Sequence, residues 1–408
     1  MNTPNNGTET TRFAEPLHVG RPNLGDKERF LARVSEMLER NWLTNDGPFV
    51  REFEKRVAEF AGVKHCIAVC NATIGLELLT RAAGLKDEVI VPAFTFVATA
   101  HALQWQEITP VFCDVDPRTH TIDPARVEEL ITPKTTGIIG VHLWGRPCDI
   151  EALAEIAGRR NLKLLFDAAH AFGCSYDGKM IGRFGLAEVF SFHATKFLNT
   201  FEGGAIVTDN DEVAAKIRLM KNFGFTGYDN VIYLGTNGKM PEICAAMGLT
   251  NLESLDEFVA ANRRNYETYR LNLAGIPGLS LLRYDDSEKC NYHYVVVEVD
   301  EVKAGLSRDE LVKLLHAENI LARRYFYPGC HRMEPYRSYY PHARLLLPET
   351  EKLAQRVLAL PTGTAISTPE IEATCSILDR AIRHSPRVRK RLREGKALLQ
   401  EAAEKQES

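Results

Sequence analysis

The sequence predicts an α/β protein in which a large domain, with a mostly parallel sheet covered by helices, is followed by a smaller C-terminal α+β domain. Short apolar runs alternate with helix-like segments from about residue 66 to residue 209. These runs are continuous in hydrophobicity, which is typical of strands that are buried on both faces. After about residue 250 the alternation gives way to mixed segments, which indicates a second unit.

The expected elements of the large domain follow in chain order. Helical spacing extends over about residues 27 to 61, with EFEKRVAEFAGV as its clearest part. The expected strands lie at residues 66–70, 87–92, 110–116, 136–145, 162–167, 188–192 and 203–209. The helices expected between them include residues 71–85, 94–105 and 150–161. In a largely parallel sheet, functional sites gather at the carboxyl ends of the strands.

The chain is expected to divide into four parts. Residues 1–14 are expected to form a flexible leader, residues 15–254 the large domain, residues 255–383 the small domain and residues 384–408 a charged helical tail. A long helical segment, NLESLDEFVAANRRNYETYRLNLAGI, leads into the small domain, and a strand is expected at residues 292–300. The tail lacks a broad apolar face, which favours a solvated helix over a partner-binding one.

Composition excludes several classes of function. The formal net charge of −4 gives no electrostatic reason to expect a nucleic-acid partner. No apolar run reaches the roughly 18 residues that a membrane span needs, and the polar N-terminus lacks the apolar core of a signal peptide. The nine cysteines are scattered and include no C-x-x-C pair. These features predict a cytoplasmic protein without a metal site.

Three reactive side chains follow predicted strands. Asp167 ends one strand, Lys196 follows another, and Thr73 lies at the start of the helix after a third. Each has an ordinary explanation when taken alone, namely a helix cap, a solvated loop lysine and a first-turn hydroxyl. If the strands are parallel, however, the three turns open on one edge of the sheet. That edge would then carry a carboxylate, an amine and a helix N-terminus together.

This combination meets the needs of pyridoxal phosphate. The aldehyde of the cofactor needs a lysine amine for a Schiff base, and its pyridine nitrogen needs a carboxylate. Its phosphate needs backbone N–H groups at a helix N-terminus and hydroxyl donors. Lys196, Asp167 and Thr73 supply these groups, and Ser191 adds a hydroxyl on the strand that precedes the lysine. We therefore interpret Lys196 and Asp167 as catalytic residues.

A set of motifs makes the chain similar to a known family. The motifs are GPFVREFE, NAT, DEVIVPAFTFVATA, GVHLWGRPCDI, FDAAHAFG, FSFHATK with EGGAIVT, and GTNGKMPEICAAMGLTNLESL. Together they resemble the DegT/StrS-type sugar aminotransferases, a branch of the fold-type I pyridoxal-phosphate enzymes. The resemblance extends from about residue 15 to about residue 380. It implies a PLP-dependent transferase fold and a homodimer with shared active sites.

The resemblance also implies individual roles. Lys196 is similar to the Schiff-base lysine that shuttles the proton, and Asp167 to the partner of the pyridinium. The remaining cofactor contacts are implied for Ala72, Thr73, Phe96, His170, Ser191 and Asn237, of which Asn237 reaches the phosphate of the second subunit. Two positions depart from many relatives. Ala72 replaces a glycine, so its backbone must adopt an ordinary conformation. Lys239 replaces an arginine that is thought to hold acidic groups of the ligand.

The function implied by the resemblance is transfer of an amino group from glutamate to a nucleotide-linked ketosugar, most similar to members that aminate C4 of dTDP-4-keto-6-deoxyglucose. The segment RRYFYPGCHRMEPYR, residues 323–337, is expected either to form a substrate wall with Tyr325 or His331 or to pack the domains together. His142 is a further candidate to line the cleft. The alternatives are amination at C3 and a PLP-binding regulatory protein without catalysis. Lys196 argues against the related dehydrating branch, which carries histidine at that position.

Overall fold

The fold is taken from a computed structural model that describes residues 13–392 and 394. The expected leader falls almost entirely on residues 1–12 and most of the expected tail on residues 395–408, so these two predictions lie outside the described residues. The described part of the tail is helical at residues 385–392. Within the described ranges, every helix is too short or too polar to cross a membrane.

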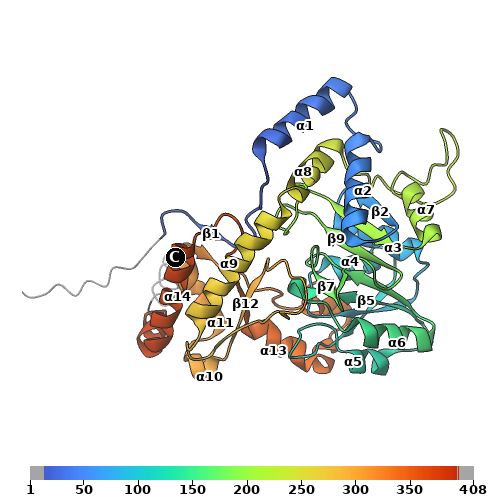
Figure 1. The fold of residues 1–408 in the computed structure, drawn as a ribbon. Helices are drawn as coiled ribbons and strands as arrows, with labels where there is room; N and C mark the ends of the chain where they lie inside the picture. The colour runs from blue at the N-terminus through green and yellow to red at the C-terminus, as the bar shows by residue number, and fades with distance from the viewer. Residues whose placement is uncertain (1–12, 393, 395–408) are drawn as a thin grey trace, which may run out of the picture.

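A seven-stranded sheet forms the centre of the large domain (Figure 1). Its strands are β2 (His65–Val69), β3 (Glu88–Pro92), β4 (Thr109–Cys113), β5 (Thr135–Val141), β6 (Lys163–Asp167), β9 (Ala187–Ser191) and β10 (Gly204–Thr208). Their order is β2-β10-β9-β6-β5-β3-β4. β10 runs antiparallel to β2 and β9, and the other neighbours are parallel. β2, β9 and β6 therefore point the same way, and the predicted mostly parallel sheet is confirmed.

Both faces of this sheet are buried, because successive side chains of a strand point to opposite sides. In β6, Leu164 and Phe166 belong to one apolar cluster and Leu165 to another. The helices that contribute to the first cluster include α2 (Pro48–Ala61), α5 (Pro124–Leu130), α6 (Ile150–Arg160) and α8 (Glu242–Leu252). Those of the second include α3 (Ala72–Ala82), α4 (Ala98–Gln104) and α7 (Asp211–Met220). The loops carry η1 (Leu143–Gly145) and the hairpin β7 (Ser175–Tyr176) and β8 (Lys179–Met180).

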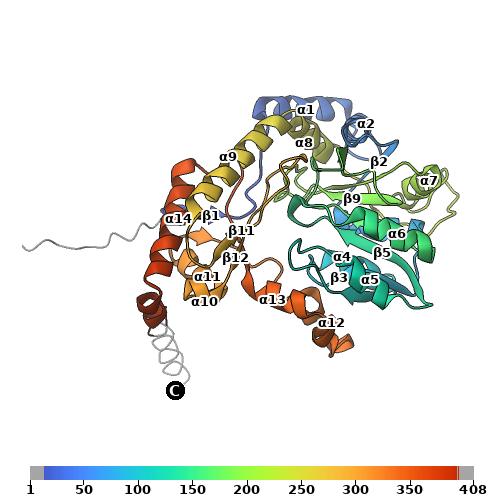
Figure 2. The same cartoon turned by 60° about the horizontal axis from the view of Figure 1, so that its bottom comes forward.

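The helical stretch expected over residues 27–61 is two helices, α1 (Lys27–Arg40) and α2. Asn41 ends α1 with a left-handed backbone, φ 52°. Pro48 lies in the first turn of α2, where its fixed φ favours the start of a helix. The break allows α1 to pack along α8 while α2 also reaches β2 of the sheet (Figure 2).

The long helix α9 (Leu255–Leu273) leads from the large domain into the small one (Figures 1 and 2). There, an antiparallel sheet has the order β11-β12-β14. The elements of this part are β11 (Leu279–Leu281), β12 (Val295–Val299), β14 (Val357–Leu360), α10 (Glu301–Ala304), α11 (Arg308–Ala317), α13 (Pro348–Arg356) and α14 (Thr368–Arg383). A separate apolar core, which includes Val297, Leu311 and Leu378, holds this domain together.

Two segments cross the division expected at residue 255. β1 (Leu17–His18) pairs in parallel with β13 (Ile320–Leu321), and Leu17 lies in the core of the small domain. Conversely, residues 330–347 pack on the large domain, where the backbone N–H of Cys330 donates to the carbonyl of Ala93 at 3.0 Å. This segment contains η2 (Cys330–Arg332), α12 (Tyr336–Tyr339) and η3 (Ala343–Leu346). Both contacts join residues that are far apart in the chain, so local sequence patterns do not predict them.

Candidate active site

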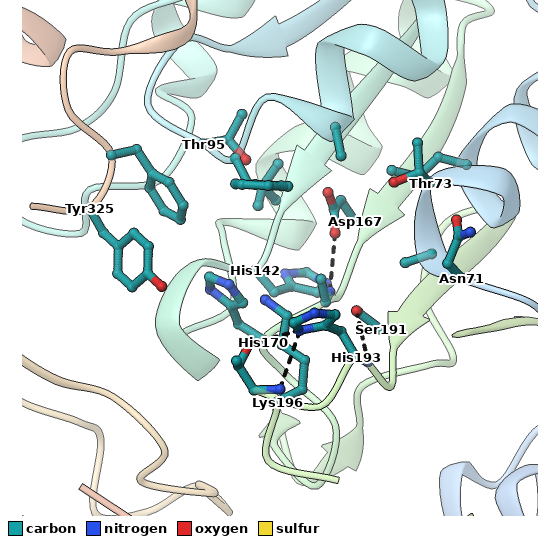
Figure 3. A pocket seen from close by; sticks show the side chains of 18 of the residues that line it. Asn71, Thr73, Thr95, His142, Asp167, His170, Ser191, His193, Lys196 and Tyr325 are labelled. Carbon is teal, nitrogen blue, oxygen red and sulfur yellow. Dashed lines mark hydrogen bonds between the residues drawn. The ribbon is translucent and has the colours of Figure 1, made fainter. Parts of the chain in front are cut away.

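A cavity of about 340 Å³ lies at the carboxyl ends of the central strands, with the small domain on its other side. The residues expected from the sequence that line it are Ala72, Thr73, Phe96, His142, Asp167, His170, Ser191, Lys196 and Tyr325. Figure 3 shows Asn71 and Thr73 on one side of the cavity, Tyr325 on the opposite side, and Lys196 and Asp167 between them. The structure thus brings the predicted amine, carboxylate and helix start to one edge of the sheet.

Lys196 follows β9 in a turn, with its backbone N–H donating to the carbonyl of His193 at 2.9 Å. Its Nζ lies 3.5 Å from the hydroxyl of Tyr294. Burial lowers the pKa of Lys196 to about 8, although the charge of Asp167 works in the opposite direction. A substantial fraction of this amine is therefore neutral near pH 8, and the neutral amine is the nucleophilic form.

Asp167 ends β6 and is only 6% exposed. Its Oδ2 accepts a hydrogen bond from the hydroxyl of Thr99 at 2.8 Å, and its Oδ1 accepts one from the backbone N–H of Ala169 at 3.1 Å. Burial raises the pKa of Asp167, while these hydrogen bonds and the Lys196 charge oppose that shift. The carboxylate is thus held in a fixed orientation in a cavity where a protonated ring nitrogen would be its natural partner.

The N-terminus of α3 forms a second side of the cavity. Asn71 is the N-cap, and its Oδ1 accepts from the backbone N–H of Ile74 at 2.9 Å. Ala72 begins the helix, and its φ is not positive. The predicted ordinary conformation of its backbone is therefore confirmed. Gly204 is needed beside it, since a Cβ there would lie 2.8 Å from the Ala72 nitrogen. Free N–H groups of the first turn, with the Thr73 hydroxyl, suit a phosphate.

His170 and Phe96 complete the walls around the centre of the cavity. The Nδ1 of His170 accepts from the backbone N–H of Trp144 at 3.1 Å, which leaves the proton of a neutral ring on Nε2. Burial lowers the pKa of His170 well below its usual value, and the Lys196 charge adds to that effect. Phe96 is 56% exposed, which is unusual for a large apolar ring and leaves one face for a ligand.

Several lining residues were not predicted. Tyr294, Arg323 and Phe326 come from the small domain, and Asn71 caps the helix where the sequence pointed to Thr73. The Asn-Ala-Thr start of an apolar helical run is a recognisable cap signal and could have identified Asn71. Arg323 and Phe326 lie in the segment 323–337 that was predicted as a possible substrate wall, although neither residue was named, whereas no local pattern identifies Tyr294.

Three predicted residues lie elsewhere in the single chain. Asn237 is exposed, and Lys239 donates from Nζ to Asn222 Oδ1 at 2.8 Å; neither lines the cavity. The structure does not bring His331 to the cavity, because this side chain is buried with its Nε2 2.6 Å from Glu351 Oε1. The segment 323–337 therefore divides: its beginning lines the cavity and its remainder packs against the large domain.

His142 lines the cavity, but both nitrogens of its ring contact other buried groups. Its ring and the carboxylate of Glu188 are both fully buried, with Nε2 3.2 Å from Oε2. Its Nδ1 accepts from the backbone N–H of Cys148 at 3.2 Å. These contacts indicate that His142 supports the strand ends rather than reacting. Across residues 13–392 and 394, no cluster of three or more His, Cys, Asp or Glu side chains is arranged to hold a metal ion.

The donor set of the cavity fits pyridoxal phosphate. A single cavity contains a half-buried lysine of lowered pKa and a buried, oriented carboxylate. It also contains the open end of a helix whose approach to β10 requires glycine. These features supply, in turn, the amine, the ring-nitrogen partner and the phosphate cradle that this cofactor uses.

Comparisons with known proteins extend over the same region. The model of the DegT/DnrJ/EryC1/StrS aminotransferase family matches residues 25–379. The chain is 40% identical over 365 residues to the dTDP-4-amino-4,6-dideoxy-D-glucose transaminase of Shigella dysenteriae, covering 89% of this chain and 98% of that protein. It is 36% identical over 382 residues to the GDP-perosamine synthase of Caulobacter vibrioides, covering 90% and 98%. The crystal structure of DesI in the presence of its TDP-sugar product matches with a TM-score of 0.90 and 50% identity, covering 94% of this chain and 97% of that one.

Proposed function

The chain belongs to the DegT/DnrJ/EryC1/StrS aminotransferase family, and we propose that it transfers an amino group from glutamate to C4 of dTDP-4-keto-6-deoxyglucose with bound pyridoxal phosphate. The observation that carries this proposal is the cavity that holds Lys196 and Asp167 at one edge of the sheet. The relatives support the choice of substrate, because one is named for a 4-amino-4,6-dideoxyglucose linked to dTDP and another was crystallised with a TDP-sugar product.

Each residue has a defined task in this proposal. Pyridoxal phosphate, when bound, supplies an aldehyde that joins amines and a ring that withdraws electrons. Lys196 anchors the cofactor through its neutral amine and, once released, carries the proton at the reacting carbon. Asp167 keeps the ring nitrogen protonated, and Thr99 and Ala169 maintain the orientation of its carboxylate.

The remaining contacts hold the cofactor in place. The first turn of α3, with Thr73 and Ser191, binds the phosphate through N–H and hydroxyl donors. Phe96 stacks on the ring through its exposed face. The Nε2 proton of His170 is available to a ring hydroxyl, since its Nδ1 already accepts a hydrogen bond from the backbone.

We also propose that the active form is a homodimer with shared sites. Asn237 and Lys239 lie outside the cavity of their own chain, on the segment between α7 and α8 that projects from the body in Figure 1. This segment exposes several apolar side chains, among them Tyr228 at 99% and Leu234 at 71%. Such exposure is typical of an interaction surface. In the dimer, Asn237 would reach the phosphate in the partner's cavity.

A cytoplasmic location is part of the proposal. All nine cysteines are free thiols. Reduced cysteines in this number are typical of the cytoplasm, where thiols are kept reduced.

The test is turnover with a panel of nucleotide ketosugars. The purified protein is incubated with pyridoxal phosphate, glutamate and dTDP-, UDP- or GDP-linked 4-keto and 3-keto sugars, and the products are identified by NMR. We expect 2-oxoglutarate and a C4 amine on the dTDP sugar in equal amounts. Lys196→Ala should abolish both, whereas Lys179→Ala, at an exposed hairpin lysine, should not. A C3 amine would show that the enzyme aminates C3 and not C4. The absence of turnover with every sugar would favour a regulatory protein.

A further inference from the structure

We propose that Arg323 binds the carboxylate attached to the reacting carbon of the amino donor. The inference rests on the proposed function, because it assigns a group of that substrate. Arg323 lines the same cavity as Lys196 and Asp167. The sequence alone draws attention to Tyr325 and His331 of this segment and not to Arg323, whose role follows from its surroundings in the structure.

The backbone of Arg323 is fixed to the core of the small domain. Its N–H donates to the carbonyl of Ala359 at 3.0 Å, and its carbonyl accepts from the N–H of Ala359 at 2.8 Å. Ala359 belongs to β14, which pairs with β12. Arg323 therefore stands on the edge of a rigid sheet, which is what a precisely placed ligand contact requires.

Two tyrosine side chains, Tyr294 and Tyr325, connect the side chain of Arg323 to the reactive amine of Lys196. The hydroxyl of Tyr294 is 3.5 Å from Lys196 Nζ. Tyr325 lines the cavity beside Tyr294 and is among the groups that raise the pKa of that phenol, after burial itself. The guanidinium carbon of Arg323 lies 5.0 Å from the centre of the Tyr325 ring. A substrate that reacts next to Lys196 would face these side chains.

Arg323 is a cation without an acidic partner within residues 13–392 and 394. Its neighbour Arg324, in contrast, pairs with Asp309 at 3.2 Å. The acidic side chains that line the cavity are occupied elsewhere: Asp167 accepts two hydrogen bonds, and Glu202 lies 3.5 Å from a histidine. The cavity thus offers an unpaired guanidinium to an incoming anion.

A carboxylate suits this position better than a diphosphate. A guanidinium presents parallel donors that match two oxygens of a carboxylate or of a phosphate, so the choice depends on where each anion lies in its substrate. In an amino acid, the carboxylate shares the carbon that carries the reacting amine, so it must enter the cavity with Lys196. In a nucleotide 4-ketosugar, the diphosphate is attached to C1, across the sugar ring from the reacting carbon.

The test compares two analogues of the donor on the holoenzyme. 2-Methylglutamate keeps both carboxylates and lacks the proton on the reacting carbon, and 4-aminobutyrate lacks only the carboxylate on that carbon. Their dissociation constants are measured by absorbance titration for the wild type, Arg323→Gln, Arg323→Lys and the control Arg324→Gln. The control removes a neighbouring arginine that does not line the cavity.

We expect Arg323→Gln to weaken 2-methylglutamate about 10- to 100-fold, as the loss of a charged hydrogen bond predicts. Arg323→Lys should weaken the binding of 2-methylglutamate less, because lysine keeps the positive charge but lacks the parallel N–H donors of a guanidinium. 4-Aminobutyrate should be insensitive to both changes, and Arg324→Gln should leave both analogues unchanged. Equal weakening of the two analogues, or an unchanged affinity for 2-methylglutamate with a raised KM for the ketosugar, would overturn the inference. If the wild-type holoenzyme binds neither analogue, the choice of glutamate as donor in the proposed function fails instead.

Discussion

Lys196 owes its reactivity to its place at the floor of the cavity. Burial is the main reason why its pKa falls to about 8, and Asp167 limits the shift. The neighbouring phenol of Tyr294 has a pKa that burial raises well above its usual value, so it stays neutral beside the amine. The result is an amine that is partly neutral close to physiological pH without a dedicated base next to it.

This environment predicts the pH dependence of cofactor capture. Only the neutral amine attacks an aldehyde, so the rate at which the apoprotein binds pyridoxal phosphate covalently should rise about tenfold per pH unit below pH 8 and level off above it. Asp167→Asn removes the charge that raises the pKa of Lys196, so its profile should move to lower pH. Stopped-flow absorbance measures both rates. A midpoint near the ordinary lysine value of 10.5 would contradict the account.

Among the elements, α3 is the one that most directly joins local sequence to the site. Asn71 caps it, Thr73 lies in its first turn, and Gly204 lets β10 approach its N-terminus. A helix N-terminus concentrates unpaired N–H groups and partial positive charge, which together attract a phosphate. The cap therefore contributes both to the stability of the helix and to the binding of the cofactor.

These two contributions can be separated with a matched pair of caps. Asn210 caps α7 by the same contact that Asn71 makes at α3, an Oδ1 that accepts from the backbone N–H three residues on at 2.9 Å. Asn71→Ala and Asn210→Ala should each lower the free energy of unfolding by about 1 kcal/mol in urea titrations. Only Asn71→Ala should also weaken the affinity for pyridoxal phosphate, because Asn210 is exposed and outside the cavity. Equal affinity for pyridoxal phosphate in the two variants would show that the Asn71 cap does not contribute to cofactor binding.

The elements of the large domain were predictable from the sequence because their signals are local. Continuous apolar runs identified every strand of the central sheet, and the chain order of strand and helix implied a common edge for Asp167 and Lys196. The stretch 27–61 was less predictable, since its helical spacing hides the left-handed Asn41 that divides it. The sequence does not decide whether the segment 323–337 forms a substrate wall or packs the domains together, because one stretch of aromatic and basic residues serves both purposes.

At the scale of the whole molecule, the small domain supplies what the sequence did not reveal. Tyr294 and Arg323 enter the cavity only because β12, β13 and β14 are folded against the large domain. The pairing of Leu17 with Ile320 joins the start of the chain to the small domain for the same reason. Such contacts connect residues about one hundred to three hundred positions apart, and neither composition nor periodicity encodes them.

The proposed dimer predicts complementation between two inactive variants. Lys196→Ala removes the amine, and Asn237→Asp places a negative charge where the partner's phosphate would bind. Each alone should be nearly inactive. Coexpressed in equal amounts, half of the dimers should be mixed and should hold one intact site in two, which restores about a quarter of the wild-type activity. Activity assays on the unseparated coexpressed mixture measure this, and mixed dimers isolated through two different tags should show about half of the wild-type activity. No recovery would show that Asn237 acts within its own chain or not at all.

The most direct measurement on the central claim is to trap the cofactor on the protein. The holoenzyme is reduced with borohydride, digested and mapped by mass spectrometry, with Lys196→Ala as the control. We expect one pyridoxyl phosphate group per chain, on the peptide that contains Lys196, and none on the variant. Attachment at another lysine, or no attachment to a protein that contains pyridoxal phosphate, would contradict this claim.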